Sequence, residues 1–285
     1  MFTKTIGLVI PAETHLFSQW AYNYYFTEIL RGVIAAASLF QWNILIHHRV
    51  IDTSDEDYVK FCKEEEIEGA ICLAPALGKK VLEKIQQMDM PLIIINSRLP
   101  GLSYVDTDNI EGAQKAADYL VEKGHKNIAV LNGDMSTTNA RDRFEGYRKS
   151  LEGSGIELPQ EMIREGKFSE DSGYNGMKDI LSGDIIPTAV LCANDLIAIG
   201  AIKSIKEKGL EIPRDISIIG FDDLIISGYL TPPLTTVRQP LFHLGKEAVV
   251  TLMSMIRGEK DSLQQIEIET RLIKRDSVAE PRSQQ

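Results

Sequence analysis

The sequence predicts an α/β protein made of two doubly wound parallel-sheet lobes, and two recurring patterns lead to this fold class. Short runs rich in Val, Ile and Leu recur along the 285 residues, bounded by Gly, Pro, Asn or Asp. Between them lie stretches whose apolar residues repeat at three- and four-residue steps. The apolar runs are typical of strands buried on both faces of a parallel sheet, and the stretches between them are typical of the helices that cover it.

The predicted strands are apolar almost throughout. They are Ile6–Ile10, Ile44–His47, Ala70–Leu73, Leu92–Ile95, Ile128–Leu131, Ala189–Cys192 and Ile216–Gly220, with a further short run at Tyr104-Val105. This is more than one small sheet holds comfortably, which favours two lobes. Because no low-complexity linker divides the chain, we expect it to cross between the lobes several times.

Two helices are predicted by their ends as well as by their periodicity. The stretches Ala113–Val121 and Ile197–Ile205 have apolar residues at helical spacing, and Glu-Lys-Gly follows each of them. We expect Gly124 and Gly209 to take the left-handed conformation that closes a helix. In both cases a strand follows, so the pattern indicates repeated βα units.

The chain is acidic, which limits its partners. Lys and Arg number 31 against 41 Asp and Glu, a formal net charge of −10, and no run of Lys or Arg exceeds a pair. Nucleic-acid binding draws much of its affinity from basic residues that neutralise phosphates. We therefore expect that any action on DNA needs another segment.

No targeting or membrane segment is expected. The apolar runs are far shorter than the ~20 residues of a membrane span, and the N-terminus lacks the pattern of a signal peptide. Cys62, Cys72 and Cys192 are far apart and show neither metal-binding nor redox spacing. These features favour a cytoplasmic location.

Polar and aromatic side chains follow the predicted strands, at the edge where ligands bind in open α/β sheets. These segments are the aromatic-rich 11–26, Asn96–Arg98, Asp106–Asn109, Asn132–Asp134, Asn139–Arg143, Asn194-Asp195 and Phe221–Asp223. Amide, carboxylate and guanidinium groups beside aromatic rings suit a sugar, because sugar hydroxyls both donate and accept hydrogen bonds. The sequence therefore predicts a small-molecule site at these strand ends.

The same residues also have purely structural interpretations. Asn194 and Asp222 could be helix N-caps, and Arg141 and Arg143 could form surface ion pairs with Asp142 or Glu145. The aromatic segment could pack in the core.

Signatures of common catalytic and nucleotide-binding sites are missing. The sequence contains no G-x-x-x-x-G-K-[ST], G-x-G-x-x-G, H-E-x-x-H or G-x-S-x-G. The pair His47-His48 has no second cluster to complete a metal site, so neither a metal nor a cofactor is expected. Binding without catalysis is the simpler interpretation, and an acid/base pair of Asp222 and Asp223 is the enzymatic alternative.

Segments along nearly the whole chain resemble one protein family. They are Ile6–Val9, Val105–Ala113, Leu120–His125, Arg141–Tyr147, Ala193–Gly200, Pro213–Asp223, Pro232–Pro240 and Arg271–Ser277. In this order they resemble the effector-binding core of the lactose/galactose repressor family of bacterial transcription regulators. That core has the type I periplasmic sugar-binding-protein fold, so the resemblance implies this fold here.

The resemblance also implies which residues bind the effector. Arg143 stands at the position of the family's effector-clamping arginine, and Arg141 is a weaker candidate. The other implied positions are Tyr25, Phe26, Asn96, Asp108, Phe168, Asn194, Asp222 and Gln239. Arg143 would grip hydroxyls with paired hydrogen bonds, Asn194 and Asp222 would donate and accept, and Phe168 with Phe26 would cover the sugar ring.

Three crossovers follow from the resemblance, near 107–109, 238–240 and 269–271. They would give an N-terminal lobe of residues 1–107 plus 239–269 and a C-terminal lobe of 108–238 plus 270–285, with the effector in the cleft between them. The effector would favour one arrangement of the lobes in a homodimer, and this shift would control the DNA-binding heads.

Two departures from the family stand out. The helix-turn-helix and hinge helix expected before residue 1 are missing from this chain, so we do not expect it to bind operator DNA as given. The Pro11–Tyr24 segment is longer and more aromatic than the usual link to the first helix.

The sequence thus predicts the ligand-sensing and dimerisation core of a repressor-type transcription regulator that senses a sugar or sugar derivative. The alternative is a secreted sugar-binding protein of a transport system. The absence of a signal peptide and the regulator-like segments Thr235–Pro240 and Arg271–Ser277 count against that alternative.

Overall fold

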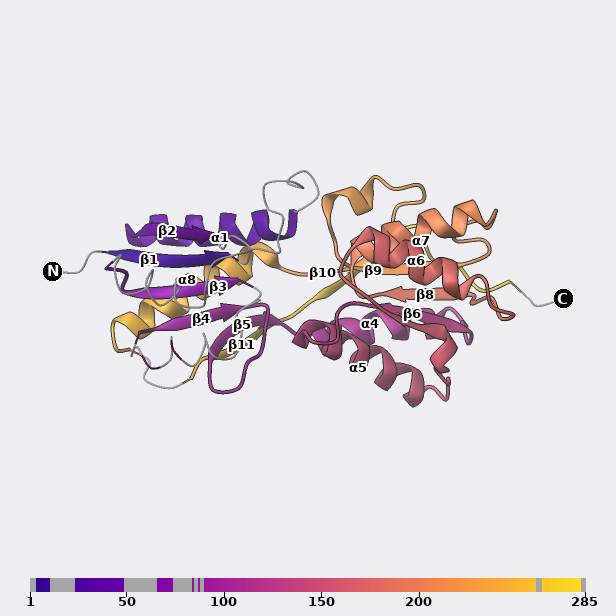
Figure 1. The fold of residues 1–285 in the computed structure, drawn as a ribbon, viewed down its shortest axis with the longest axis horizontal. Helices are drawn as coiled ribbons and strands as arrows, with labels where there is room; N and C mark the ends of the chain where they lie inside the picture. Colours follow the sequence, from indigo (N-terminus) through magenta and orange to yellow (C-terminus); the bar gives the residue numbers. More distant parts are fainter. Residues whose placement is uncertain are drawn as a thin grey trace. The chain divides into compact units, whose positions relative to one another are not determined.

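A computed structural model describes residues 4–10, 24–48, 66–73, 84, 87, 90–259 and 263–282. The chain divides into two compact units (Figure 1). Unit 1 comprises Met1–Thr107 and Pro240–Ile268, and unit 2 comprises Asp108–Gln239 and Glu269–Gln285. The chain therefore passes from one unit to the other three times, and neither unit is a single continuous segment.

Unit 1 contains a six-stranded sheet in which every neighbouring pair is parallel. In order across the sheet, the strands are β11 (Gln265–Ile268), β5 (Ser103–Thr107), β4 (Leu92–Ile95), β3 (Gly69–Leu73), β1 (Thr5–Ile10) and β2 (Asn43–His48). Helices α1 (Tyr24–Phe40) and α8 (Leu241–Ile256) pack against each other over one face.

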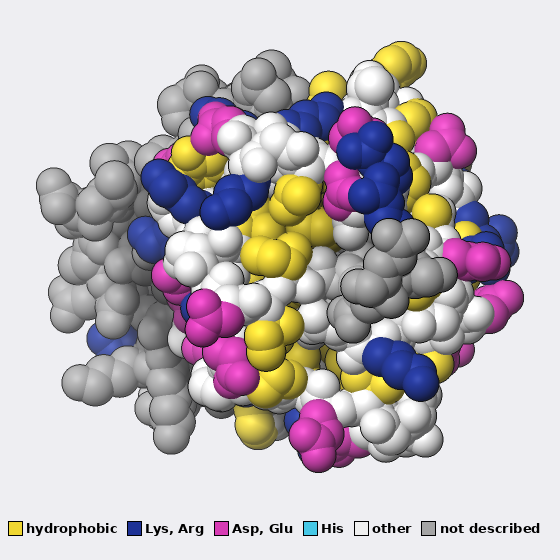
Figure 2. Space-filling view, turned by 90° about the vertical axis from the view of Figure 1, so that its right-hand side faces the viewer, with side chains coloured by type: hydrophobic (Ala, Val, Ile, Leu, Met, Phe, Trp, Pro, Cys, Tyr) yellow, Lys and Arg dark blue, Asp and Glu magenta, His cyan; other side chains and the backbone are white. Residues whose placement is uncertain are grey.

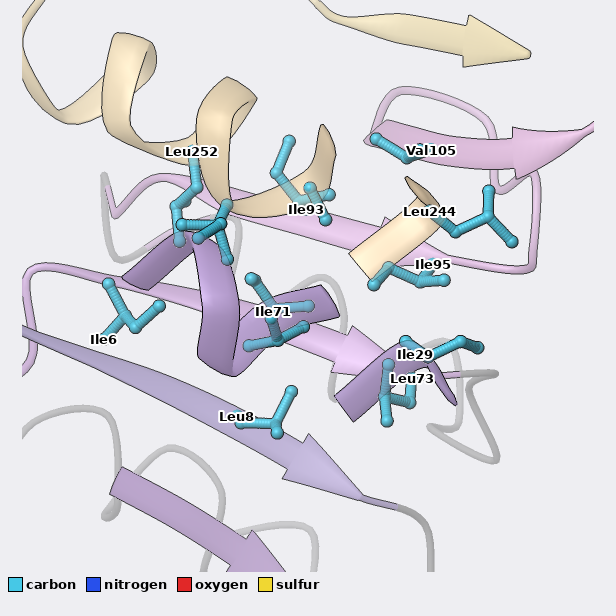
Figure 3. Close-up of a cluster of buried hydrophobic side chains, with 14 of the residues drawn as sticks. Ile6, Leu8, Ile29, Ile71, Leu73, Ile93, Ile95, Val105, Leu244 and Leu252 are labelled. Atoms are coloured by element: carbon cyan, nitrogen blue, oxygen red, sulfur yellow. The ribbon is translucent and has the colours of Figure 1, made fainter. Parts of the chain in front are cut away.

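The sheet of unit 1 has a hydrophobic cluster on each face, because successive residues of a strand point to opposite sides. Leu8 and Ile71 join the cluster under α1 and α8, where Figure 3 shows them with Leu244 and Leu252. The next residue of each of these strands, Val9 or Cys72, joins the cluster on the other face. This two-sided burial explains why the central strands β1, β3 and β4 are apolar at almost every position.

Unit 2 also has a six-stranded sheet. In order across it, the strands are β12 (Arg271–Ile273), β10 (Thr235–Arg238), β9 (Ser217–Asp222), β8 (Ala189–Cys192), β6 (Ile128–Asn132) and β7 (Ile163–Glu165). All neighbours are parallel except β12, which runs antiparallel to β10. Numbered along the chain, both sheets have the strand order 2-1-3-4-5-6.

Helices cover both faces of the sheet in unit 2. Helices α4 (Asn109–Glu122) and α5 (Thr138–Gly153) contribute to the cluster on one face, and α6 (Glu170–Ile180) and α7 (Asp195–Glu207) contribute to the cluster on the other. Two 3-10 helices, η2 (Gln160–Met162) and η3 (Ile225–Gly228), lie in the connections. This is a doubly wound α/β arrangement, and the predicted fold class is confirmed.

Each apolar run predicted as a strand forms one, with ends within two residues of the prediction. Gly124 and Gly209 follow α4 and α7 with φ of +90° and +80°, the predicted left-handed closure. The strands β7, β10, β11 and β12 were not predicted, because their sequences mix polar and apolar residues. The Pro11–Asn23 part of the aromatic segment lies outside the described residues. Among the described helices, none is long and apolar enough to span a membrane.

Glycines let paired helices approach until their backbones touch. In the α1–α8 pair, a Cβ added at Gly32 or at Gly245 would overlap a backbone carbonyl of the partner helix. The α6–α7 pair has the same arrangement at Gly173 and Gly200. Both helix pairs are therefore set at a separation that only glycine permits.

We expect Gly200→Ala to lower the free energy of unfolding by about 1–3 kcal/mol, because a methyl group forced into a close contact displaces the backbones. Gly153, at the end of α5, is the matched control, since nothing lies within 4 Å of an added Cβ there. Gly153→Ala should leave stability unchanged or raise it by ~0.5–1 kcal/mol. Urea unfolding of the two variants measures both values. Equal stabilities for wild type and Gly200→Ala would contradict the close contact.

Candidate functional site

The candidate site of unit 2 lies where the strand order reverses. The chain goes from β6 to its neighbour β7 on one side and then returns to β8 on the other side of β6. The helices that follow β6 and β8 thus leave toward opposite faces of the sheet, and the crevice at the carboxyl ends of such strands is where open α/β sheets bind ligands. Arg143 lies at this edge.

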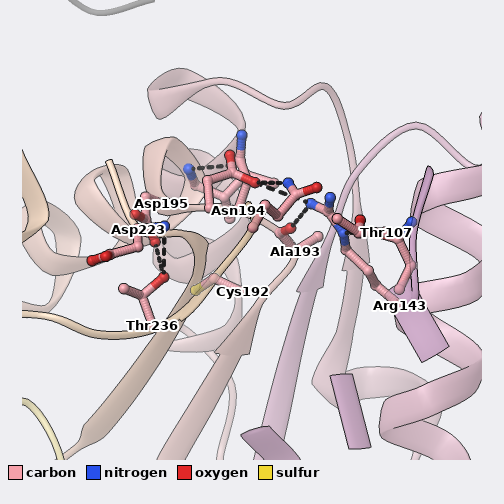
Figure 4. A network of polar contacts seen from close by, with 12 residues as sticks. Thr107, Arg143, Cys192, Ala193, Asn194, Asp195, Asp223 and Thr236 are labelled. Carbon is pink, nitrogen blue, oxygen red and sulfur yellow. Dashed lines mark hydrogen bonds and ion pairs between the residues drawn. The ribbon is translucent and has the colours of Figure 1, made fainter. Parts of the chain in front are cut away.

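Arg143 is a buried cation held from several sides. Arg143 is only 3% exposed. Its Nε donates to Asn109 Oδ1 at 2.9 Å, and one Nη donates to the carbonyl of Ala193 at 2.6 Å. Figure 4 shows Arg143 reaching from its helix to the strand end at Ala193. Among the described residues, none accepts a hydrogen bond from the second Nη.

Two aromatic rings flank the guanidinium. Its Cζ lies 3.8 Å from the centroid of Phe221 and 5.9 Å from that of Phe168. Phe168 packs directly on Gly133, where an added Cβ would overlap the ring. Cation–π attraction helps to hold the planar guanidinium in a fixed orientation.

The buried carboxylate of Asp222 balances this charge. Its Oδ1 lies 3.6 Å from Arg143 and accepts a hydrogen bond from Gln239 Nε2 at 2.6 Å. Burial raises the pKa of Asp222 to about 6, against the opposing effects of Arg143 and Gln239. Arg143, Phe168, Asp222 and Gln239, all predicted from the resemblance, therefore meet in one cluster.

A second buried carboxylate, Asp195, lies behind this cluster at the start of α7. It accepts hydrogen bonds from the Leu224 N–H at 2.8 Å, the Ser227 hydroxyl at 2.6 Å and the Thr236 hydroxyl at 2.5 Å. Burial raises its pKa to about 7, and the charge of Asp222 adds to the rise. Asp195 thus ties α7 to η3 and β10 (Figure 4).

Two predicted residues serve as helix caps. The Asn194 side chain accepts from the Ile197 N–H at 2.9 Å, and the Asp108 side chain accepts from the Glu111 N–H at 2.8 Å. The structural interpretation of Asn194 is thus confirmed, and its buried position beside Ala193 still places it next to the Arg143 contact.

Arg141 and Arg143 face different surroundings. Arg141 is exposed and donates to the carbonyls of Met135 and Ser136, both at 2.8 Å. The structure therefore does not bring Arg141 into the cluster. The interpretation of Arg143 as a surface ion pair is wrong, because its side chain is buried against Asp222.

Three predicted residues belong to unit 1. Tyr25 and Phe26 lie in the first turn of α1 in an edge-to-face contact, with ring centroids 5.2 Å apart, and both pack on the core cluster. Asn96 follows β4 in a left-handed conformation, with φ of +67°. It is 6% exposed, and its Oδ1 has no hydrogen-bond partner in the part of the chain that the structure describes.

Sequence reasoning did not assign functional roles to Phe221, Asn109 or Asp195. The prediction placed Phe221 in a segment that follows a strand, but its sequence neighbours give no sign of its contact with Arg143. Asn109 and Asp195 each follow a polar residue that the prediction had singled out. The roles of all three depend on contacts across the fold that a local pattern does not reveal. Among the described residues, no group of three His, Cys, Asp or Glu could hold a metal ion.

A protein with two doubly wound units, three chain passages between them and a polar cluster at strand ends belongs to the class of two-lobed ligand-binding proteins. Comparison with known proteins agrees. Residues 117–278 match the model of the periplasmic binding protein-like domain. The HTH-type transcriptional repressor PurR of Pasteurella multocida is 32% identical over 285 residues, covering 97% of this chain and 81% of the relative.

Solved structures give the same result. A transcriptional regulator CelR in complex with cellobiose matches with a TM-score of 0.90 and 26% identity, over 96% of this chain and 84% of that one. A LacI-family regulator of Enterococcus faecium with bound ribose matches with a TM-score of 0.82 and 26% identity, over 98% of this chain and 100% of that one. The chain belongs to the lactose/galactose repressor (LacI) family of transcription regulators and is the ligand-sensing core of such a protein.

The buried carboxyl group of Asp195 predicts a pH dependence of stability. Its folded pKa of about 7 lies above the ordinary value of an aspartate, so the folded state binds more protons than the unfolded state between these two values. Stability from this group is therefore present at low pH and is lost as the pH rises toward 7. Relative to Asp195→Asn, the wild type should lose unfolding free energy between pH 5 and pH 7, as measured by urea unfolding at constant ionic strength. A pH-independent difference between the two proteins would contradict the raised pKa.

Proposed function

We propose that this regulator core senses a sugar or sugar derivative, which binds at the Arg143 cluster of unit 2. The observation that carries the proposal is a buried guanidinium at the strand-order reversal, close to two aromatic rings and a carboxylate, whose second Nη has no acceptor among the described residues. The proposed binding residues there are Arg143, Phe168, Asn194, Asp222 and Gln239. Asp108, and Tyr25, Phe26 and Asn96 of unit 1, stay predictions from the sequence. Arg141 is left out of the proposed site, because it is exposed and donates to the carbonyls of Met135 and Ser136.

The chemistry of the cluster suits a neutral polyhydroxylated ligand. A guanidinium donates to two hydroxyl oxygens in parallel, while the Asp222 carboxylate accepts from hydroxyl protons. Phe168 offers a ring face to the C–H groups of a sugar. The charges of Arg143 and Asp222 offset each other, so the cluster favours hydroxyl groups over a strongly charged ligand.

The relatives support this choice of ligand and the assembly that goes with it. Two of the solved relatives, those described above, were solved with cellobiose and with ribose, both neutral sugars. The proposal also includes that the protein is cytoplasmic, forms a homodimer and binds its operator through a helix-turn-helix segment. On the described part of the face drawn in Figure 2, Lys and Arg side chains are interspersed with Asp and Glu and form no continuous basic surface. This distribution supports a separate DNA-binding segment.

The two alternatives have less support. A transport protein would not account for a 32% identical relative that is an HTH-type repressor. For an acid/base enzyme, Asp222 and Asp223 would have to act on one reacting group. Their carboxylates instead engage separate partners, Arg143 and Gln239 for Asp222 and Arg238 and Arg275 for Asp223.

We expect Arg143→Ala to weaken binding of the effector by about 10- to 100-fold, because a hydrogen bond from a charged donor contributes roughly 1.5–3 kcal/mol. Isothermal titration calorimetry with cellobiose and with ribose measures the effect. Phe168→Ala, which removes only a ring face, should weaken binding by about tenfold and carries less risk to the fold.

Arg141→Ala is the matched control for Arg143→Ala, because it removes an exposed arginine of the same helix. Its affinity for the same sugar should equal that of the wild type within error. Undiminished binding by both Arg143→Ala and Phe168→Ala would overturn the proposed site, and an equal loss in Arg141→Ala would show an unspecific effect on α5.

A further inference from the structure

The turn that follows β9 has an unusual backbone. Asp222 and Asp223 both have positive φ, +114° and +57°. Such conformations are costly for residues other than glycine and persist only where the surroundings fix them. Asp222 is the proposed effector-binding carboxylate, so whatever fixes this turn also fixes the direction of that carboxylate.

Two arginines hold the turn through the side chain of Asp223. Arg238 Nε lies 2.6 Å from one carboxylate oxygen, and an Nη of Arg275 lies 2.6 Å from the other. The Asp223 side chain is only 6% exposed and that of Arg275 only 21%, so water screens this ion pair little, whereas the Arg238 side chain is 54% exposed. Arg275 also donates to the carbonyl of Leu234 at 2.7 Å, which anchors it to the rest of unit 2.

The two aspartates bind two neighbouring residues of one strand end. Asp223 binds Arg238, the last residue of β10, and Asp222 accepts from Gln239, the next residue along the chain. The parallel register of β9 and β10 sets Arg238 opposite Asp222. At Pro240 the chain enters unit 1. The turn therefore binds Arg238 and Gln239, the last two residues before the chain leaves unit 2.

We infer that Asp223 is a positioning residue for the effector site. Its ion pairs with Arg238 and Arg275 hold the strained turn so that the Asp222 carboxylate stays directed at Arg143 and Gln239. Asp223 itself is not assigned a contact with the effector, and it acts through Asp222. The role in binding rests on the proposed function, whereas the effect on the Asp222–Gln239 contact does not.

The test compares Asp223→Asn with Asp215→Asn. Asparagine keeps the shape of aspartate and tolerates positive φ, so Asp223→Asn removes mainly the charge. Asp215 precedes β9 as Asp223 follows it, and it also pairs with two arginines, Arg214 at 3.4 Å and Arg282 at 2.6 Å. Arg275→Gln, which removes one of the two ion pairs, is the second variant in case Asp223→Asn does not fold.

The first readout needs no ligand. The side-chain NH₂ signals of Gln239 in ¹H–¹⁵N spectra, assigned with Gln239→Glu, report on the hydrogen bond to Asp222. We expect Asp223→Asn and Arg275→Gln to shift these signals and Asp215→Asn to leave them in place. Unshifted signals in both folded variants, or an equal shift in Asp215→Asn, would overturn the inference.

The second readout is the affinity for cellobiose and for ribose by calorimetry. For the sugar that the wild type binds, Asp223→Asn should weaken binding by about tenfold, because a binding group held loosely loses its geometry. Asp215→Asn should bind as the wild type does. If the wild type binds neither sugar, the choice of probe sugars in the proposed function fails, and the Gln239 signals still decide the inference. Unchanged affinity in Asp223→Asn, for a sugar that the wild type binds, would overturn the role in binding.

Discussion

Unit 2 buries the guanidinium of Arg143 almost completely. A buried cation is tolerated only when hydrogen bonds and an opposite charge replace the water it has lost. Those replacements come from α4, β9 and the end of β8, so three parts of the unit must converge on one side chain. The strand ends around it are consequently polar and closely fixed, in contrast to the apolar interior of the same strands.

The buried carboxylates connect Arg143 to the surrounding elements of unit 2. Asp222 balances Arg143, and Asp195 binds η3 and β10 through three donors. Asp223 forms ion pairs with Arg238 and Arg275. These arginines lie close to the points where the chain passes between the units for the second and third time. A perturbation at the Arg143 cluster is thus linked by direct hydrogen bonds and ion pairs to the segments that leave unit 2. The ligand-sensing role of the family requires a link of this kind, since a bound effector acts only by favouring one state over another.

Most of the fold could be predicted from the sequence, because a central strand that is buried on both faces appears as a short run of apolar residues. Strands such as Leu92–Ile95 have no polar position, and Gly124 and Gly209 mark helix ends that the structure confirms. The short strands β7, β11 and β12 are not apolar throughout, because strands at or near an edge bury less of their surface. Strand β10 is buried at three of its four residues, but its sequence, Thr-Thr-Val-Arg, has one apolar residue. Within the site, the strand-end pattern indicated Arg141 and Arg143 alike, and the resemblance alone ranked Arg143 above Arg141. The burial of Arg143 depends on contacts with Ala193 and Asn109, 50 and 34 residues away along the chain, which no local spacing encodes.

The interleaved order of the two units has a consequence for the way this protein is made. Unit 1 needs β11, which ends at Ile268, and unit 2 needs Ser277, whose hydroxyl is buried between the strands at Ile218 and Thr235. His125 likewise binds the carbonyl of Ala279. Neither unit can therefore be completed on the ribosome before residues near 268 and 279 have emerged. Unlike domains that are continuous in sequence and fold one after another during synthesis, these two units receive their last segments almost together.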